Sequence, residues 1–310
     1  MTPDLKNLEL FLRVARLGAI GRAGAEFGLS STNASQRIQA LERELGVKLF
    51  HRSTRVVTLT QDGEILRDYA ERILNDVEDL RNVLSRDQGQ ASGLLRVTAS
   101  ATFAETHIIP FIPEFHRSHP QVQMDLNLTD QVLDIVALGI DLAFRIGELA
   151  PSSLLAQKID DNPMTLVAHP DYLAERGVPQ TPADLADHTC LALGEARSWR
   201  FLGPDGQEHR VQINSSLRSN FGAAIGAWVG AGVGIGVASL WKAAPGLQAG
   251  KIVRVLPDYT YLPKMDIWAV RPPGRRMPAR VKVFLDFIST RIRATNEELY
   301  GACLRAGKTC

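Results

Sequence analysis

Hydrophobic side chains recur at helical spacing along the first 45 residues, which predicts consecutive short helices. The first covers residues 5–17, and a turn that contains Gly28 separates the next two. Ser30 or Ser31 is placed to cap the third helix. Two short helices joined in this way predict a helix-turn-helix. The apolar positions are Leu8, Phe11, Leu12 and Ala15, then Ala23, then Ala34, Ile38, Leu41 and Leu45.

The polar face of the third predicted helix suits the major groove of DNA. Hydroxyl, amide and guanidinium groups can donate to and accept from base edges, while the apolar side chains point elsewhere. A solvated face on an ordinary helical hairpin has a similar composition, so this pattern alone leaves both interpretations open. The candidate DNA-reading residues are Ser31, Thr32, Asn33, Ser35, Gln36 and Arg37.

Residues 49–59 read as two short β runs, which predict a hairpin directly after the third helix. Gly46 is suited to end that helix. A basic turn joins the two runs and can lie on phosphates or enter the minor groove. Its candidate contacts are Arg52, Ser53, Thr54 and Arg55. Residues 1–60 therefore predict an all-α helix-turn-helix domain with a β hairpin appended, and the basic turn of this hairpin favours DNA binding over the solvated-face interpretation.

A long linker helix is predicted from Gln61 to about Asp87, with Thr60 as its cap. Its apolar positions advance in alternating steps of four and three, the spacing of a two-helix seam. Packing of the stripe on the helix's own domain is the alternative. A dimer would present two recognition helices to a two-fold symmetric DNA site. The stripe consists of Leu66, Ala70, Ile73, Val77, Leu80 and Leu84.

Predicted strands alternate with helices beyond a polar linker that ends near residue 91, which predicts a two-lobed α/β domain over residues 92–295. The second lobe covers about residues 162–264, and the tail 296–310 has no assigned role. The first lobe should contain a largely parallel sheet. Its predicted strands are 94–99, 122–128, 141–145 and 265–270, its predicted helices 105–116, 132–138 and 278–293; the second lobe opens with a strand at 164–168.

Polar groups at predicted strand ends suggest an anion site in the α/β domain. Ser100 and Thr102 lie between a strand and a helix, where hydroxyls and backbone N–H groups favour a small anion. Arg145, at another strand end, can bind a carboxylate bidentately. Ligands of open sheets bind outside such strand ends. Alternatively, Ser100 only caps its helix, and Arg145 pairs with Glu148 or a neighbouring subunit.

Composition and charge support this division of the chain. The 310 residues carry a net charge of +1, but residues 1–60 hold nine basic and five acidic side chains and so concentrate the positive charge where DNA is expected. The three cysteines form no CxxC pair, and no apolar leader follows Met1. A reduced, cytoplasmic location is expected.

Several other signals are weaker than they look. Residues 221–241 are uncharged over the length of a membrane span, but their glycines and the alternation at 231–237 favour a short helix followed by a buried strand. His116 and His119 lack a third metal ligand nearby in the sequence. Ser100, His107 and His169 lack the context of an activated nucleophile. We expect no enzyme activity, metal, cofactor or membrane association.

The N-terminal residues together resemble the winged helix-turn-helix of LysR-type transcriptional regulators. The α/β region resembles the periplasmic-binding-protein-like effector domain of the same family at 141–147, 152–154, 169–173 and 182–185. The N-terminal matches are Phe11, Gly18, Ala23, Ser30, Ser35, Ile38, Leu41-Glu42, Leu45-Gly46, Leu49-Phe50-His51-Arg52 and Leu59-Thr60-Gln61-Asp62-Gly63.

The resemblance implies a homodimer or homotetramer that binds double-stranded DNA, with RNA polymerase as a possible further partner. It also implies that a small-molecule effector lies between the lobes; together with the anion-suited groups above, this suggests a small carboxylate. The implied effector residues are Ser100, Thr102, Arg145, Gly147, His169, Asn220 and Phe221. The alternative is a ligand-binding co-regulatory protein whose helix-turn-helix contacts only protein.

The chain also departs from the family pattern. Ser31 and Thr32 stand where Gln and Pro are common, so the base preference cannot be transferred. Ala19 and Ile20 replace a usual Ser-Phe pair. Gly24 replaces a usual Ala, which should loosen its helix by roughly 1 kcal/mol. On this basis Gly24→Ala is expected to raise stability.

Overall fold

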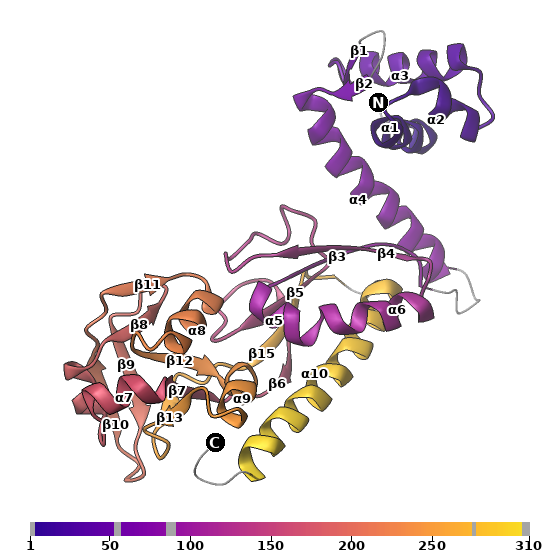
Figure 1. Cartoon of the computed structure of the whole chain (residues 1–310). Helices are drawn as coiled ribbons and strands as arrows, with labels where there is room; N and C mark the ends of the chain where they lie inside the picture. The colour runs from indigo at the N-terminus through magenta and orange to yellow at the C-terminus, as the bar shows by residue number, and fades with distance from the viewer. Residues whose placement is uncertain (1–3, 53–56, 85–90, 275–276, 306–310) are drawn as a thin grey trace. The chain divides into compact units, whose positions relative to one another are not determined.

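The computed structural model describes residues 4–52, 57–84, 91–274 and 277–305. The chain divides into two compact units, Met1–Leu94 and Leu95–Cys310. Figure 1 shows the order of the elements along the chain.

The first unit is the winged helix-turn-helix that the sequence predicts. Helix α1 ends at Gly18, and both α1 and α3 end on a glycine in the left-handed conformation. Ser30, rather than Ser31, caps α3, since its side chain accepts a hydrogen bond from the Asn33 N–H at 3.2 Å. The elements are α1 (Leu5–Leu17), α2 (Ile20–Glu26), α3 (Ser31–Leu45), β1 (Phe50–Arg52), β2 (Val57–Leu59) and α4 (Gln61–Leu84).

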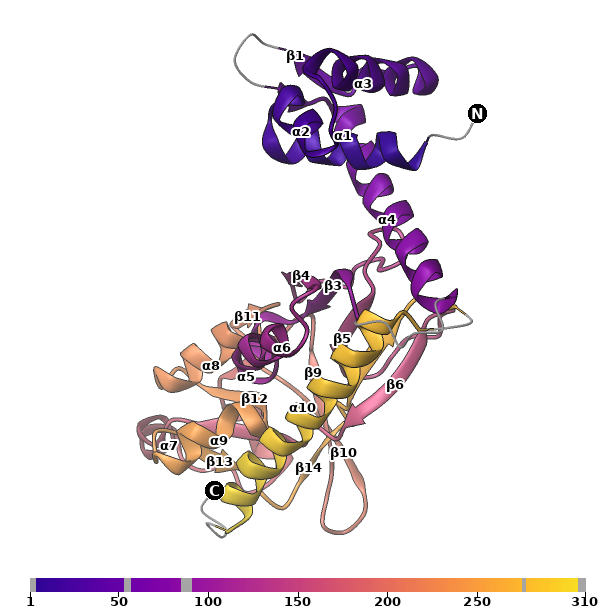
Figure 2. The ribbon, with the colours of Figure 1, turned by 90° about the vertical axis from the view of Figure 1, so that its right-hand side faces the viewer.

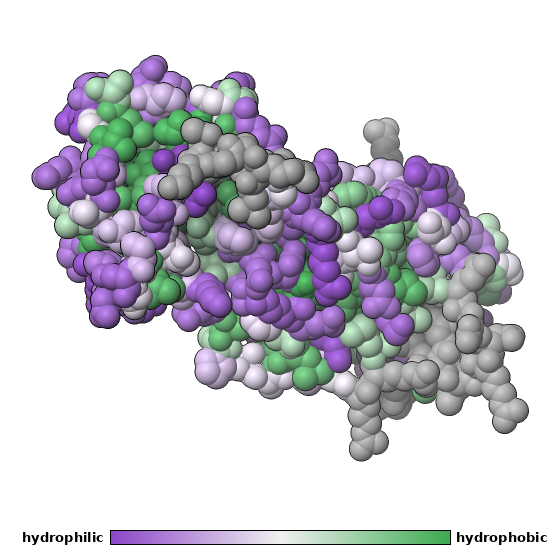
Figure 3. Space-filling view, turned by 90° about the horizontal axis from the view of Figure 1, so that it is seen from below, coloured by the Kyte–Doolittle hydropathy of each residue, from purple (hydrophilic) through white to green (hydrophobic). Residues whose placement is uncertain are grey.

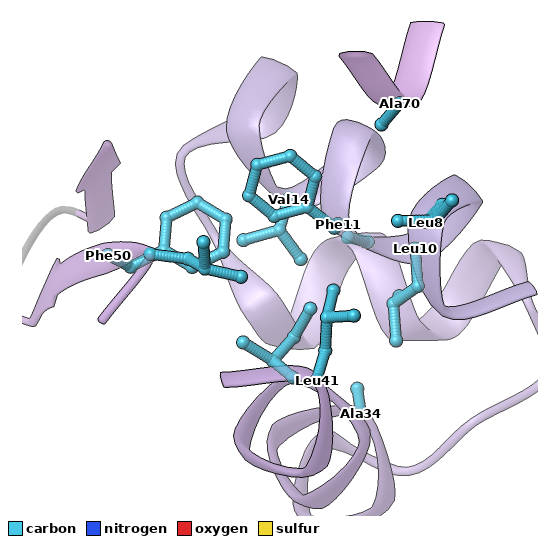
Figure 4. Packing of buried hydrophobic residues seen from close by; sticks show 11 residues of the cluster. Leu8, Leu10, Phe11, Val14, Ala34, Leu41, Phe50 and Ala70 are labelled. Atoms are coloured by element: carbon cyan, nitrogen blue, oxygen red, sulfur yellow. The ribbon is translucent and has the colours of Figure 1, made fainter. Parts of the chain in front are cut away.

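One apolar cluster holds these elements together, as Figure 4 shows. Phe11 of α1 lies against Phe50 of β1, with ring centroids 5.3 Å apart. Leu41 of α3 and Ala70 of α4 belong to the same cluster. Because every element contributes to this core, α3 is held in one orientation about its own axis. Leu45, predicted to be apolar and inward, is 36% exposed and lies at the edge.

The start of α4 packs on its own domain, which is the alternative left open for its apolar stripe. Ala70 is fully buried in the core of the first unit, and Leu66 packs partly against it. Ile73 and Leu80 are 40% and 56% exposed. The side chain of Leu84 lies outside the described residues. The predicted stripe is therefore divided between a buried beginning and an exposed continuation.

The second unit contains two five-stranded sheets and one three-stranded sheet. The first lobe has strand order β4-β3-β5-β15-β6, and the second has β11-β8-β12-β7-β13 beside β10-β9-β14. The first-lobe strands are β3 (Gly93–Ala99), β4 (Val122–Leu128), β5 (Leu142–Ile146), β6 (Leu155–Asp160) and β15 (Ile267–Arg271). The others are β7 (Met164–Ala168), β8 (Cys190–Leu193), β9 (Ser198–Leu202), β10 (Glu208–Gln212), β11 (Leu217–Ser219), β12 (Ile235–Ser239), β13 (Val253–Val255) and β14 (Thr260–Leu262).

The sheets are mixed, so the expectation of a largely parallel sheet was wrong. β3 and β5 are parallel, but β15 is antiparallel to both β5 and β6. In the second lobe β8 is parallel to β11 and β12, and β7 is antiparallel to β12 and β13. The cause is the crossing of the chain between the lobes after β6 and again before β15, which returns strands in the opposite direction.

Short helices connect the strands of both lobes. As expected for residues 221–241, a helix is followed by a buried strand, α8 and then β12. The helical segments are α5 (Ala101–His107), η1 (Ile109–Phe111), α6 (Ile112–Ser118), α7 (Pro170–Arg176), η2 (Pro182–Asp187), α8 (Gly222–Gly230), α9 (Leu240–Gln248) and α10 (Ala279–Arg305).

The predicted helix at 132–138 was wrong. The Asp134 carboxylate accepts hydrogen bonds from the Val136 and Ala137 N–H groups at 3.1 and 2.9 Å, and Gly139 has φ +63. The segment is therefore one capped turn. Asp competes with helix propagation by bonding the nearby backbone, and a left-handed glycine stops it.

Two other helices differ in extent from those predicted. The helix expected at 105–116 begins at Ala101 and divides into α5, η1 and α6, since Pro110 and Pro113 lack the N–H that a continuous helix needs. The helix expected to end near Arg293 continues to Arg305 as α10. It therefore takes in most of the segment predicted as a separate tail.

Among the described residues, none of the helices combines the length and apolar character needed to cross a bilayer. On the face seen in Figure 3, hydrophilic residues surround separate hydrophobic patches.

Gly24 marks a very close approach between α2 and α3. A Cβ built on Gly24 would lie 2.6 Å from the Cβ of Ala34, a buried residue of α3. No real pair of methyl groups sits so close, so the helices would have to separate. The expectation that alanine at position 24 stabilises the protein considered only helix propensity, and this contact contradicts it.

We predict that Gly24→Ala lowers the free energy of unfolding by about 1–3 kcal/mol, the usual cost of overpacking. Denaturant unfolding of the full chain measures it. Ala34→Gly removes the opposing methyl group, so the double variant should lose less than the sum of the two single variants. A gain in stability for Gly24→Ala alone would refute the clash.

Candidate functional site

The predicted DNA-reading side chains gather on one accessible face of α3. Ser31, Thr32, Asn33 and Gln36 are exposed, and Ser35 and Arg37 are partly exposed. The opposite face of the same helix is buried through Ala34, Ile38 and Leu41. The helix thus presents hydroxyls, amides and one guanidinium outward, as groove recognition requires.

A buried carboxylate ties the end of α3 to the hairpin that follows. Glu42 is 3% exposed and accepts hydrogen bonds from the Leu49 N–H and the Lys48 ammonium, both at 3.0 Å. The Thr60 hydroxyl donates to the Lys48 carbonyl at 2.6 Å and accepts from the Gly63 N–H at 3.0 Å. These bonds anchor both ends of the hairpin. Glu42 was recognised in the sequence only as a family match; its role needed the structure.

The hairpin has the expected antiparallel pairing, with Phe50 opposite Leu59 and Arg52 opposite Val57. Ser53, Thr54, Arg55 and the side chain of Arg52 lie outside the described residues. Their contact with DNA stays a prediction.

In the first lobe of the second unit, Ser100 and Arg145 follow neighbouring strands. β3 and β5 are parallel with Thr98 opposite Ala143, and Ser100 and Arg145 each come two residues after this pair. Both lie at the carboxyl ends of their strands, where open sheets bind ligands. Ser100 also caps α5, because its hydroxyl accepts from the Phe103 N–H at 3.3 Å.

Three buried polar atoms at these strand ends have no hydrogen-bond partner among the described residues: Thr98 Oγ1, Thr102 Oγ1 and Arg145 Nη2. Unsatisfied buried polar atoms are uncommon in folded proteins and call for an explanation, such as a bound ligand or water. Thr98 lies near the end of β3, Thr102 in the first turn of α5 and Arg145 near the end of β5.

Arg145 is half-buried and only partly satisfied. Its Nη1 donates to the Phe144 carbonyl at 3.3 Å. Burial lowers the pKa of the guanidinium, and nearby Asp130 partly opposes that shift; burial also raises the pKa of Asp130. Among the described residues Arg145 is not found in an ion pair with Glu148, and a pairing with a neighbouring subunit stays a prediction.

The second lobe meets this region at the start of α8. A Cβ built on Gly222 would lie 3.8 Å from Thr102 Oγ1, so the segment after Asn220 and Phe221 approaches α5. Phe221 is 41% exposed, and its N–H donates to Ser219 Oγ at 3.1 Å. Predicted residues of both lobes therefore come together here.

His169 is placed by a different contact. It caps α7, with Nδ1 accepting a hydrogen bond from the Asp171 N–H at 3.2 Å. A Cβ on Gly232 would lie 3.8 Å from its side chain. No contact found in the described residues joins His169 to Ser100, Thr102 or Arg145.

A cavity of about 430 Å³ adjoins Gly147, whose φ is +116. Trp268, in its wall, is the cross-strand neighbour of Arg145 on β15. The charged residues Arg200 and Lys264 were missed from the sequence, because strand alternation shows which face a residue is on but not that a distant strand leaves a cavity there. The lining consists of Gly147, Glu148, Arg200, Leu262, Pro263, Lys264, Asp266 and Trp268.

Two of the histidines considered for catalysis or metal binding have contacts that stabilise the fold. His107 is fully buried and hydrogen-bonds Asn296, while His119 stacks on Phe115 with ring centroids 4.7 Å apart. Across the described ranges no group of three or more His, Cys, Asp or Glu side chains is arranged to hold a metal.

Comparison with known families accounts for both units. Residues 5–64 match the bacterial regulatory helix-turn-helix protein family of lysR type, and residues 88–293 match the LysR substrate binding domain. The chain belongs to the LysR family of transcriptional regulators.

Individual LysR regulators resemble it along nearly their whole length. The regulator DmlR of Escherichia coli K12 is 32% identical over 290 residues, covering 92% of this chain and 94% of DmlR. PtxR of Pseudomonas aeruginosa is 36% identical over 292 residues, covering 91% of each chain.

Solved structures agree with this assignment. CrgA, a LysR-type regulator from Neisseria meningitidis, superposes with a TM-score of 0.59 at 26% identity over 94% of this chain and 99% of CrgA. The Vibrio cholerae virulence activator AphB gives 0.57 at 25% identity, over 92% of this chain and 98% of AphB. This LysR regulator therefore has the family's fold: an N-terminal helix-turn-helix domain and a two-lobed α/β regulatory domain.

Proposed function

We propose that this LysR regulator reads DNA with the exposed face of α3, assisted by the β1–β2 hairpin. The observation that carries the proposal is the division of α3 into a buried apolar face and an outward face of hydroxyl, amide and guanidinium groups. The basic excess of residues 1–60 supplies the charge needed against phosphates. Contact with RNA polymerase and a cytoplasmic location stay predictions.

Arg37→Ala should weaken binding to a duplex that covers the region upstream of the protein's own coding sequence by about tenfold, the value of one good base or phosphate contact. Arg43→Ala removes the same charge from the exposed end of α3 on a different face, and should change binding less. Fluorescence anisotropy at several salt concentrations measures both.

The salt series also tests the alternative function. For a DNA-binding protein the logarithm of affinity falls linearly with the logarithm of salt concentration. Weak binding at low ionic strength with no salt dependence would indicate instead that the helix-turn-helix contacts only protein, as in a co-regulatory subunit.

We further propose that a second copy of the chain pairs along the exposed side of α4, giving a homodimer that can assemble to a homotetramer. Ile65, Tyr69, Ile73 and Leu80 are 52%, 56%, 40% and 56% exposed. The first three follow at steps of four and so share one side of the helix. Leu66 and Ala70, which were predicted to belong to the dimer stripe, pack inward on their own domain. At the start of α4 the proposed seam therefore uses the preceding residues, Ile65 and Tyr69, in their place.

Ile73→Glu should shift the protein from dimer toward monomer while leaving its helical content unchanged, since Ile73 is exposed within its own chain. Gln61→Glu adds the same charge at the exposed first residue of α4 and should keep the dimer. Sedimentation velocity distinguishes the two states. An unchanged sedimentation coefficient for Ile73→Glu would place the dimer contact elsewhere.

The effector, we propose, is a small carboxylate bound between the lobes at the first-lobe strand ends. The unsatisfied atoms of Thr98, Thr102 and Arg145 support this, because an anion can satisfy two hydroxyls and a guanidinium at once. The cavity beside Gly147 adds Arg200 and Lys264 as cationic groups, although Glu148 and Asp266 also line it and Arg200 forms an ion pair with Glu208. His169, Asn220 and Phe221 remain predicted contributors from the second lobe.

Succinate or benzoate at high concentration should raise the melting temperature, because a ligand at 100 times its Kd adds about 2.7 kcal/mol to stability. Arg145→Ala should abolish the shift. Thr102→Val should weaken it without lowering basal stability, since Thr102 Oγ1 makes no bond to lose. Arg200→Ala tests the cavity wall, and Arg197→Ala, an exposed arginine nearby in sequence, is the control. An unchanged shift in Arg145→Ala would contradict the site.

A further inference from the structure

The last helix, α10, extends beyond the end of the region that matches the family's effector domain. The family match ends at residue 293, whereas α10 continues to Arg305. Two residues beyond the match pack on the rest of the unit: Asn296 is 1% exposed, and the partly buried Leu299 packs against an apolar cluster. Through them the helix is attached to the second unit past the end of the family match.

On the first-lobe side, Asn296 joins two separate elements through its amide. Its Nδ2 lies 2.8 Å from Asp160 Oδ2, and its Oδ1 lies 2.8 Å from His107 Nε2. A carboxylate only accepts hydrogen bonds, so the amide must direct its NH2 group toward Asp160 and its oxygen toward His107. His107 must then carry its proton on Nε2. The chain of bonds runs from His107 through Asn296 to Asp160.

The two partners of Asn296 have contrasting positions. His107 ends α5, the short helix that Ser100 caps at the candidate effector site. Asp160 is the last residue of β6, where the chain leaves the first lobe for the second. Asn296 therefore holds α5 in place against one of the crossing points between the lobes.

On the second-lobe side, the same helix makes apolar contacts. Leu299 packs against a cluster that includes Val167 of β7, Val229 of α8 and Leu247 of α9. The Tyr300 hydroxyl donates to the Asp161 carbonyl at 3.4 Å. Figures 1 and 2 both show the end of α10 alongside α9, and Trp241 of α9 meets the His107 ring edge-on at 4.7 Å.

We propose that the segment from Arg293 to Tyr300 is a strap that sets the angle between the two lobes, with Asn296 as its positioning residue. One end of the strap is hydrogen-bonded to the first lobe and the crossing strand, and the other packs, partly buried, against the second lobe. Any change of lobe angle must break one set of these contacts or bend the helix. The strap acts on the lobes whichever effector or operator the protein uses.

A distance measurement between the lobes tests the strap directly. Spin labels are attached at Gln123→Cys on β4 and Glu175→Cys on α7, both exposed, in the full chain with Cys303→Ser and Cys310→Ser; buried Cys190 is kept. Excess unlabelled chain suppresses distances between subunits. Double electron–electron resonance should show one narrow distance for the parent protein and a broadened or shifted distribution for Asn296→Leu.

Two further variants separate the hydrogen bonds from simple packing. The double exchange Asp160→Asn with Asn296→Asp moves the carboxylate from position 160 to position 296. The new carboxylate can accept from His107 Nε2–H and from the new amide at position 160, so both hydrogen bonds are kept and the narrow distance should be restored. Glu297→Gln, an exposed neighbour on the same turn, should not change it.

An unchanged distribution in Asn296→Leu overturns the strap, and so does equal broadening in Glu297→Gln. Failure of the exchanged pair to restore the narrow distance overturns the positioning role of Asn296. If circular dichroism shows that Asn296→Leu does not fold, Leu299→Ala decides instead: a broadened distance supports the strap, and the parental distance refutes it.

Discussion

The close packing of α3 against α1 and α2 is the constraint on which the DNA-binding unit depends. Phe11, Leu41 and Phe50 share one core, and Gly24 lets α2 approach α3 more closely than any larger residue would permit. This packing fixes the rotation of α3 about its axis. The polar side chains of α3 therefore face outward as a set, which is the condition for reading a groove.

Electrostatics in the first unit serve attachment as well as recognition. Glu42 places a negative charge in the interior, where it is compensated by the Leu49 N–H and the Lys48 ammonium. A buried carboxylate with such partners favours one geometry strongly, because leaving it unpaired is costly. The start of the hairpin is consequently fixed to the end of α3 by hydrogen bonds to Glu42.

The second unit balances satisfied and unsatisfied polar groups in different places. At the start of α5 and the end of β5, Thr102 Oγ1 and Arg145 Nη2 are buried without a hydrogen-bond partner among the described residues, an arrangement that a bound anion would stabilise. At the far end of α5, by contrast, His107 and Asn296 are hydrogen-bonded to each other. Helix α5 thus connects the candidate effector site at its first turn with the His107–Asn296 hydrogen bond at its last residue.

Local sequence patterns predicted the helix-turn-helix, the cap at Thr60, the hairpin after Gly46 and the strands β3, β4, β5, β7, β12 and β15. These follow from hydrophobic period and capping chemistry, which act over a few residues. Polar groups at predicted strand ends pointed to Ser100, Thr102 and Arg145, and the family resemblance added the effector cleft with His169, Asn220 and Phe221 from the second lobe. Tertiary structure alone decided the contact at Gly24, the inward side of α4, the direction of β15, the cavity at Trp268 and the burial of Asn296. Each of these depends on what a distant segment places opposite a residue, and no local pattern in one sequence records that.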